Sequence, residues 1–249
     1  MRITEHLYLI GSGAHGISHR GDCHVYLVDA GPSLLFIDAG CGEDTGRLVD
    51  NLAADGLDPA AVSHILVTHA HRDHAGGAAS LSFALPGPVA VTASEAEAEL
   101  LETGSEKDVG LGAIGLGGRT RAEVFPVSRV QRRVRDGEVL EVGRLRIRTI
   151  IVPGHNPGCS CWLMELDGRR MLFAGDVIFC GGYISVGNWP TCDPRAYRES
   201  LPRLAGLGID ALLSGHHLWT LAGGQSHIDR AIGDFQRLWP PPGINEVRG

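Results

Sequence analysis

One short segment of the sequence gathers several side chains of the kinds that bind metal ions. Residues 68–77 read THAHRDHAGG, which places His69, His71, Asp73 and His74 within six positions. Imidazole and carboxylate groups are ligands for borderline divalent cations such as zinc. A turn after a strand can aim alternate side chains at one ion and the following residues at a second. We therefore expect His69 and His71 to face one metal ion, and Asp73 and His74 to face another.

Three more side chains of these types follow apolar segments that are typical of buried strands. The segments 149–152, 171–174 and 211–213 are followed by His155, Asp176 and His216. Each of these residues, taken alone, would also fit a helix cap or a turn. Together with the first cluster, they predict seven metal ligands at the ends of neighbouring strands.

The segments around these residues alternate between strand-like and helix-like patterns. Apolar runs around turn residues predict hairpins, and apolar residues at helical spacing predict helices. Hairpins are expected at 25–38, 134–152 and 161–174, a strand at 63–68, and helices at 45–57, 94–101, 197–204 and 228–238. Strands punctuated by single helices, repeated once, predict two sheets packed face to face with helices outside. The predicted fold class is therefore α/β, a four-layer αββα sandwich of two similar halves in one domain, 1–249.

A glycine-rich segment at 103–118 lies between the two halves. Long loops of this kind are either lids over a site or solvent-exposed insertions. The sequence is compatible with both alternatives.

The composition favours a globular protein that acts on small molecules. The chain has 249 residues, of which 43% are hydrophobic, so it can bury a core without disulfides or a structural metal. Any metal site should therefore be functional. The net charge of −7 opposes binding to nucleic acids and to anionic membranes. We interpret the basic cluster of Arg129, Arg132, Arg133 and Arg135 as a solvated face.

The sequence also indicates the cellular compartment. The first residues contain no apolar run of signal-peptide length, and no run approaches the roughly 20 residues that span a bilayer. We therefore expect a cytoplasmic protein with no membrane partner. Its six cysteines would stay mostly reduced in that compartment.

The ligand pattern resembles that of a known family. The motif THAHRDH at 68–74, the turn Pro153-Gly154-His155 and the separate Asp176 and His216 resemble the signature of the metallo-β-lactamase-fold hydrolase superfamily. The match runs from Val25 to about His216, and it is to the glyoxalase II and lactonase branch. The resemblance implies an αββα fold and two bound metal ions. It implies one metal on His69, His71 and His155, a second on Asp73, His74 and His216, and Asp176 as a bridge.

This ligand set implies metal-assisted hydrolysis. Two divalent cations lower the pKa of a bridging water, so that a hydroxide can attack a carbonyl or phosphoryl centre near neutral pH. Asp73 could then pass a proton to the leaving group. Zinc is preferred on ligand type, and the same nitrogen and oxygen donors also accept manganese or iron.

Asp176 and the residues that follow it restrict the expected class of substrate. β-Lactamases of this fold usually replace the bridging aspartate, and Asp176 is retained here, which favours a small-molecule ester, thioester or lactone. Glyoxalase II relatives hold glutathione with basic side chains, and residues 177–185 contain neither Arg nor Lys. Two alternatives stay open, a β-lactamase and a mononuclear iron sulfur dioxygenase that would use His69, His71 and His155.

Four further residues have roles that the sequence leaves open. Asp38 resembles the family's aspartate that holds the ligand turn in place, with a simple turn cap as the alternative. Lactonases of the fold use a tyrosine near the metals; Phe179 stands at that position, and Tyr183 is close enough to replace it or else packs in the core. His217 is either a neighbour of the site or a support for it, and His24 stands where many relatives have Asn.

Overall fold

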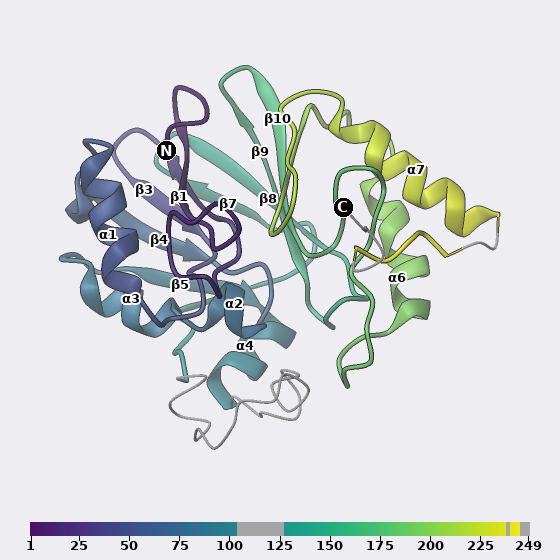
Figure 1. Ribbon diagram of the computed structural model, residues 1–249, viewed down its shortest axis with the longest axis horizontal. Helices are drawn as coiled ribbons and strands as arrows, with labels where there is room; N and C mark the ends of the chain where they lie inside the picture. The colour runs from purple at the N-terminus through teal and green to yellow at the C-terminus, as the bar shows by residue number, and fades with distance from the viewer. Residues whose placement is uncertain (104–126, 238–239, 245–249) are drawn as a thin grey trace.

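Two β-sheets lie face to face between two groups of helices (Figure 1). This computed structural model describes residues 1–103, 127–237 and 240–244. Within those residues, the first sheet has six strands in the order β1 (Leu7–Gly11), β2 (Val25–Asp29), β3 (Leu34–Ile37), β4 (Val62–Leu66), β5 (Ala90–Ser94) and β6 (Arg132–Val134). The second sheet has five strands in the order β11 (Ala211–Ser214), β10 (Arg169–Gly175), β9 (Ser160–Leu166), β8 (Leu145–Ile151) and β7 (Val139–Val142). Each sheet is therefore built from one half of the chain.

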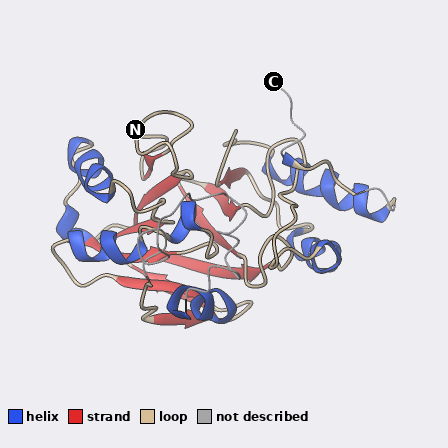
Figure 2. Cartoon of the chain, turned by 60° about the horizontal axis from the view of Figure 1, so that its bottom comes forward, coloured by secondary structure: helices blue, strands red, loops and turns tan. Residues whose placement is uncertain are grey.

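Helices cover the outer face of each sheet (Figures 1 and 2). The first sheet carries α1 (Thr45–Ala54), α3 (Ala78–Ala84) and α4 (Glu95–Thr103). The second sheet carries α6 (Pro194–Ser200) and α7 (Gly224–Gln236). Single turns of helix complete the described elements: η1 (Pro59–Ala61), α2 (Arg72–Ala75) and η3 (Leu201–Leu204).

Three apolar cores separate these four layers. One lies under α1, α3 and α4, one lies between the sheets, and one lies under α6 and α7. In the middle core, Tyr26 of β2 and Phe173 of β10 meet edge to face at 5.5 Å. Their neighbours Leu27 and Leu172 point to the outer cores, because successive side chains of a strand face opposite sides. The predicted αββα sandwich is confirmed.

Turn and cap residues fix several of these elements locally. Asp167 and Gly168 both have positive φ, 51° and 70°, which is the conformation that joins two antiparallel strands by a tight turn, here β9 and β10. At the start of α6, the Asp193 side chain accepts hydrogen bonds from the backbone N–H groups of Arg195 and Ala196, and Pro194 occupies the first turn. The hairpin at 161–174 and a helix at 197–204 were both predicted.

Two elements differ from the sequence prediction. Helix α1 ends at Ala54 rather than at 57, because Gly56 adopts a left-handed φ of 80° and terminates the helix. The segment 134–152 is not one set of hairpins: β6 pairs with β5 in the first sheet, and Asp136-Gly137 crosses to the second sheet, where β7 and β8 form the hairpin. A short alternating run does not reveal which sheet it joins.

The arginine cluster lies at this crossing, beside acidic partners. Arg132 pairs with Glu138 at 3.0 Å, and Arg133 pairs with Glu102 at 2.5 Å. These ion pairs are partly exposed, in agreement with the interpretation of a solvated face. Of the glycine-rich segment 103–118, Thr103 ends α4, and residues 104–118 lie outside the described residues. Among the helices that the structure describes, none has the length and apolar character needed to cross a bilayer.

The strand directions determine where the predicted ligands meet. β3, β4 and β5 run parallel in the first sheet, so their carboxyl ends share one edge. In the second sheet β8, β10 and β11 also share a direction, because β9 is antiparallel to both β8 and β10 and β11 is parallel to β10. The segments after β4, β8, β10 and β11 carry all seven predicted ligands.

Candidate metal centre

The first group of predicted ligands converges after β4 and β8. Nε2 of His155 lies 3.1 Å from Nε2 of His69 and 2.9 Å from Nδ1 of His71. His69 and His155 are buried, and His71 is half-buried at the N-terminus of α2. The donor atoms of the three residues lie within 4.8 Å of one another, which is close enough for one ion to contact all three.

The second group converges between α2 and the end of β11. Nε2 of His216 lies 2.9 Å from a carboxylate oxygen of Asp73 and 3.2 Å from Nε2 of His74. The donor atoms of these three residues also lie within 4.8 Å of one another. His74 is fully buried, whereas the Asp73 side chain is 37% exposed. This group therefore lies at the solvent-facing side of the centre.

Asp176, after β10, lies between the two groups. Its Oδ2 is 3.7 Å from Nε2 of His155, and its Oδ1 is 3.4 Å from Nε2 of His74 and 3.7 Å from Nε2 of His216. One carboxylate thus presents a different oxygen to each group. The structure brings all seven predicted ligands together.

The donor atoms fit bound cations better than hydrogen bonds among themselves. Nδ1 of His155 lies 3.1 Å from the Ser185 carbonyl, an acceptor, so Nδ1 carries the proton and the lone pair of Nε2 faces the centre. Nε2 of His155 faces one ring nitrogen of His69 and one of His71, and its single lone pair can accept a hydrogen bond from only one of them. Oδ1 of Asp176 is buried and has no hydrogen-bond partner among the described residues. Unpaired donors of this kind are what divalent cations satisfy.

The electrostatics of the two groups differ. Burial lowers the pKa of His71 to about 3, and burial also lowers the pKa of His69 and of His155, so these imidazoles are neutral at physiological pH. Burial opposes protonation of His216 as well, but Asp176 and Asp73 raise its pKa above the usual value. The acidic residues therefore lie nearest the second group.

The carboxylates of the centre are ionised. Burial alone would raise the pKa of Asp176, but the imidazoles of His216, His74 and His155 lower it well below its usual value. The pKa of Asp73 is also lowered, since His74 and His216 outweigh its burial. Ionised carboxylates and neutral imidazoles are the forms that ligate metal ions.

Asp38 supports both the turn after β4 and the second group. It follows β3 with a left-handed φ of 62°. Its Oδ1 accepts the backbone N–H of Thr68 at 2.7 Å, and its Oδ2 accepts the Thr68 hydroxyl at 2.9 Å. The same Oδ2 lies 2.8 Å from Nδ1 of His74. Asp38 is therefore more than a turn cap, because it orients a predicted ligand through the ring nitrogen that faces away from the centre.

His24 performs the same kind of positioning for the loop of His216. Its backbone N–H donates to the Gly215 carbonyl at 2.6 Å, and its Nε2 lies 2.9 Å from the His217 carbonyl. Nδ1 of the same ring lies 2.9 Å from the Ser12 hydroxyl. His217 has a left-handed φ of 59° and an exposed side chain. Both residues thus support the site, with His24 bonded on either side of His216.

Two aromatic residues, Trp189 and Tyr183, lie in different settings. Trp189 packs edge-on against His71 and His155, at ring distances of 5.6 and 5.0 Å, and its Nε1 donates to the His155 carbonyl. Tyr183 is half-buried with its ring against Gly181, and its hydroxyl forms no hydrogen bond with any described residue.

Tyr197 is a supporting residue for which the sequence predicted only a position in a helix. Its hydroxyl donates to the carbonyls of Asp176 at 3.0 Å and Val177 at 2.6 Å, and its ring lies against Gly154. It therefore contacts the turns of two predicted ligands, His155 and Asp176. Helical spacing explained its burial equally well, so no sequence signal separated this role.

A further group of donor types lies outside the centre, at His19, Asp22 and Cys41. Nδ1 of His19 accepts the Gly21 N–H at 3.2 Å, and Oδ1 of Asp22 accepts the Cys41 N–H at 2.8 Å. Burial raises the pKa of the Cys41 thiol to about 12, so it is protonated. The His19 and Asp22 acceptors are therefore occupied by hydrogen bonds, one within the loop between β1 and β2 and one to the segment after β3.

Comparison with known proteins identifies the family. A model of the metallo-beta-lactamase superfamily matches residues 20–216, which include every predicted ligand. The chain belongs to the metallo-beta-lactamase superfamily. The resemblance inferred from the ligand motif is therefore confirmed.

Relatives within the metallo-beta-lactamase superfamily differ in their named activities. The chain is 30% identical over 208 residues to the lactamase-like protein nscB of Neosartorya fischeri, covering 83% of this chain and 51% of that protein. It is also 30% identical over 229 residues to the acyl-coenzyme A thioesterase MBLAC2 of Gallus gallus, covering 83% of this chain and 78% of the relative. The chain thus spans about half the length of the fungal relative.

Solved structures of the superfamily share the fold. A B3 metallo-beta-lactamase with an active-site glutamic acid superposes with a TM-score of 0.73 at 27% identity, covering 95% of this chain and 88% of the other. Superfamily membership supports a hydrolase that uses divalent metal ions, and the clusters described above are the residues that could hold them.

Proposed function

We propose that this protein is a dinuclear metal hydrolase that cleaves a small-molecule ester, thioester or lactone. The observation that carries the proposal is the position of Asp176, whose two oxygens face different ligand groups. A pair of divalent cations would lower the pKa of water and supply the hydroxide nucleophile. The ligand types favour zinc, and manganese and iron are the alternatives. His69, His71 and His155 would hold one cation and Asp73, His74 and His216 the other.

The protein side chains would carry out the remaining work. Asp73 is 37% exposed at the outer side of the centre, so it can take up a proton and deliver it to the leaving group. Trp189 packs edge-on against His71 and His155 and so limits the movement of both rings. The Tyr183 hydroxyl has no partner among the described residues, which leaves it available to donate to a substrate oxygen.

Three observations bear on the substrate. The named activity of the Gallus gallus relative, an acyl-coenzyme A thioesterase, supports hydrolysis of an acyl group. The retained Asp176 supports ester, thioester or lactone hydrolysis over β-lactam hydrolysis, and the uncharged segment 177–185 argues against glutathione thioesters.

All six cysteines are free, which supports a cytoplasmic location.

A second candidate function is β-lactam hydrolysis. It is favoured by the structural match to a B3 metallo-beta-lactamase at 27% identity. A chromogenic cephalosporin assayed beside ester, thioester and lactone panels separates the two candidates by their relative kcat/KM.

Metal analysis combined with these panels tests the proposal. Protein purified without added metal should contain two zinc or manganese ions per chain and should turn over at least one ester, thioester or lactone. One iron per chain with sulfide-dependent oxygen uptake would instead establish a mononuclear dioxygenase. Tyr183→Phe should lower kcat about 100- to 1,000-fold with the metal content unchanged, since an oxyanion donor is lost; unchanged kcat would remove Tyr183 from the mechanism.

A further inference from the structure

Helix α4 contributes a fully buried carboxylate to the back of the metal centre. Glu97 lies in the first turn of α4 and is 0% exposed. Its Oε2 accepts the backbone N–H of Ala70 at 2.7 Å and the side-chain N–H of Asn156 at 3.0 Å. Its Oε1 accepts the backbone N–H of Gly158 at 2.8 Å. These three donors therefore belong to two turns, one after β4 and one after β8.

These two turns carry the first group of ligands. Ala70 lies between His69 and His71, and Asn156 follows His155 directly. The turn after β4 belongs to the first sheet and the turn after β8 belongs to the second. Glu97 is thus a single side chain that joins the two segments whose separation determines the distances among these three imidazoles.

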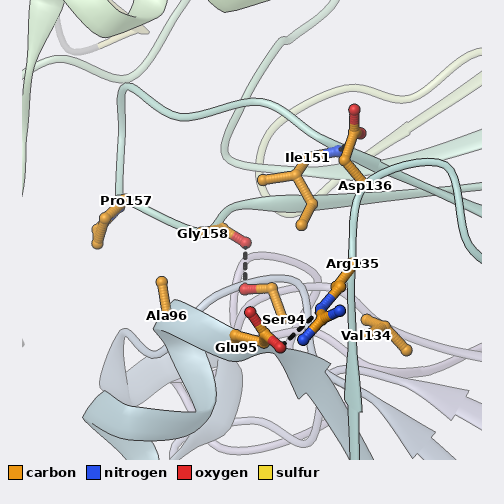
Figure 3. A pocket seen from close by; sticks show the side chains of 9 residues that line it. All are labelled: Ser94, Glu95, Ala96, Val134, Arg135, Asp136, Ile151, Pro157 and Gly158. Carbon is orange, nitrogen blue, oxygen red and sulfur yellow. Dashed lines mark hydrogen bonds and ion pairs between the residues drawn. The ribbon is translucent and has the colours of Figure 1, made fainter.

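A second contact from the same helix end reinforces this connection. The Ser94 hydroxyl donates to the Gly158 carbonyl at 2.7 Å (Figure 3). The same hydroxyl accepts the Glu97 N–H at 3.3 Å. A Cβ at Gly158 would lie 2.3 Å from Ser94 Oγ and 3.0 Å from Glu97 Cγ, so only glycine fits there. A hollow of about 240 Å³ lies beside this contact, and none of the seven predicted ligands lines it. Figure 3 shows the side chains that do line it.

The sequence around Ser94 makes the geometry informative. Ser-x-x-Glu at a helix start normally forms a capping box, in which the glutamate accepts the N–H of the serine. Here Ser94 performs its half of the box, but the Glu97 carboxylate turns away from the helix to the ligand turns. The helix therefore lacks the hydrogen bond from the Ser94 N–H to the Glu97 carboxylate. Burying this carboxylate is unfavourable, and burial raises the pKa of Glu97 above its usual value.

We propose that Glu97 is a positioning residue that fixes the spacing of His69, His71 and His155 and thereby determines the affinity of the first metal site. The inference rests on the proposed dinuclear centre and goes beyond it, because Glu97 touches none of the seven ligand side chains. It acts through the backbone of Ala70 and through Asn156 and Gly158. Because the three N–H donors are divided between the two carboxylate oxygens, both side-chain atoms at these positions must accept hydrogen bonds.

Glu97→Gln tests this requirement with almost no change in shape. The amide nitrogen of glutamine can only donate, so it would face a donor from Ala70, Asn156 or Gly158 and leave it unpaired. Glu99→Gln is the matched control, since Glu99 lies on the same helix with an exposed side chain. The experiment titrates metal-free wild type and both variants with Co²⁺, following visible absorption and heat. His155→Ala identifies which binding step belongs to the first site.

The expected result is a site-selective loss. Glu97→Gln should weaken the first-site step about 10- to 100-fold, the range for loss of an outer-layer partner, with the second step within about twofold of wild type. Glu99→Gln should leave both steps unchanged. If Glu97→Gln does not fold, Asn156→Ala, which removes one of the three donors, should weaken the first step in the same direction.

Other results would overturn the inference. If Glu97→Gln lowers the thermal stability of the metal-free protein but binds Co²⁺ in both steps as Glu99→Gln does, Glu97 is only structural. The same conclusion follows if Asn156→Ala titrates as wild type when it is the variant that folds. Wild type that takes up fewer than two ions would reject the dinuclear centre itself, and the inference with it.

Discussion

Oδ2 of Asp38 lies 2.8 Å from Nδ1 of His74, on the side of the ring that faces away from the metal centre. Both side chains are buried, with exposed fractions of 2% and 0%. Because the carboxylate can only accept, it keeps the proton on Nδ1 and leaves the lone pair of Nε2 for a cation. Burial opposes a raised pKa at His74, but Cys23 and the surrounding carboxylates raise it, and a bound cation would displace that extra proton.

Asp38→Asn should therefore reduce metal affinity without removing a ligand. The amide nitrogen of asparagine would donate to Nδ1 of His74 and shift the ring proton to Nε2, which faces the centre. We expect affinity at the second site to fall about 10- to 100-fold, measured by competition with a chromogenic chelator. Asp50→Asn is the control, because Asp50 is an exposed residue of α1. Equal metal affinities for the two variants would contradict the proposal that Asp38 orients His74.

Asp176→Ala should abolish turnover. It removes the one carboxylate that faces both ligand groups, so we expect kcat to fall by more than the roughly 100-fold typical of outer-layer losses and the second metal to weaken most. Steady-state kinetics and metal content after dialysis measure the two effects. Retained activity with two metals bound would mean that Asp176 is not the bridge.

Tyr197→Phe should destabilise the fold and slow turnover together. The variant loses the hydroxyl that donates to the carbonyls of Asp176 and Val177. Loss of these buried bonds should lower the free energy of unfolding by about 1 to 2 kcal/mol, measured by denaturant unfolding of the metal-free protein. Tyr8→Phe is the control, because the Tyr8 hydroxyl makes only a 3.5 Å contact with the Glu5 carbonyl. Similar losses for both variants would count against a specific role for Tyr197.

His24 should make stability depend on pH. Burial lowers its pKa from 6.5 to about 4, against the opposing effect of the His217 carbonyl. The unfolded chain then binds more protons than the folded chain between these values, so the stability present above pH 6.5 is lost as the pH falls toward 4.

Between pH 7.5 and pH 5.5, metal-free wild type should lose about 1.3 kcal/mol more free energy of unfolding than His24→Asn, which cannot titrate. Denaturant unfolding at the two pH values measures the difference. Parallel losses in wild type and variant would show that His24 titrates alike in the folded and unfolded states.

The ligand residues could be predicted from the sequence because their signal is local. His69, His71, Asp73 and His74 lie within one turn region, and His155, Asp176 and His216 each follow an apolar strand. The direction of the strands, which places their ends together, follows from the order of hairpins and helices. The αββα layers could be predicted for the same reason, since the continuous apolar runs of β2 and β10 are typical of strands buried on both faces.

The supporting residues could not be predicted because their partners are distant in the chain. Glu97 bonds to Ala70 and Gly158, and Tyr197 bonds to Asp176, across separations of 21 to 61 residues. Ser94 and Glu97 matched an ordinary helix start, and Tyr197 matched an ordinary core position. The sheet joined by β6 was also decided by distant pairing, with β5, rather than by its own residues.

The donors of the centre are divided between the two sheets. His69, His71, Asp73 and His74 follow a strand of the first sheet, whereas His155, Asp176 and His216 follow strands of the second. Any cation held by donors from both sides is therefore a cross-link between the halves of the molecule, comparable in effect to a covalent staple. A cation that binds only the folded chain would increase the free energy of unfolding, so the ions would stabilise the architecture as well as perform its chemistry.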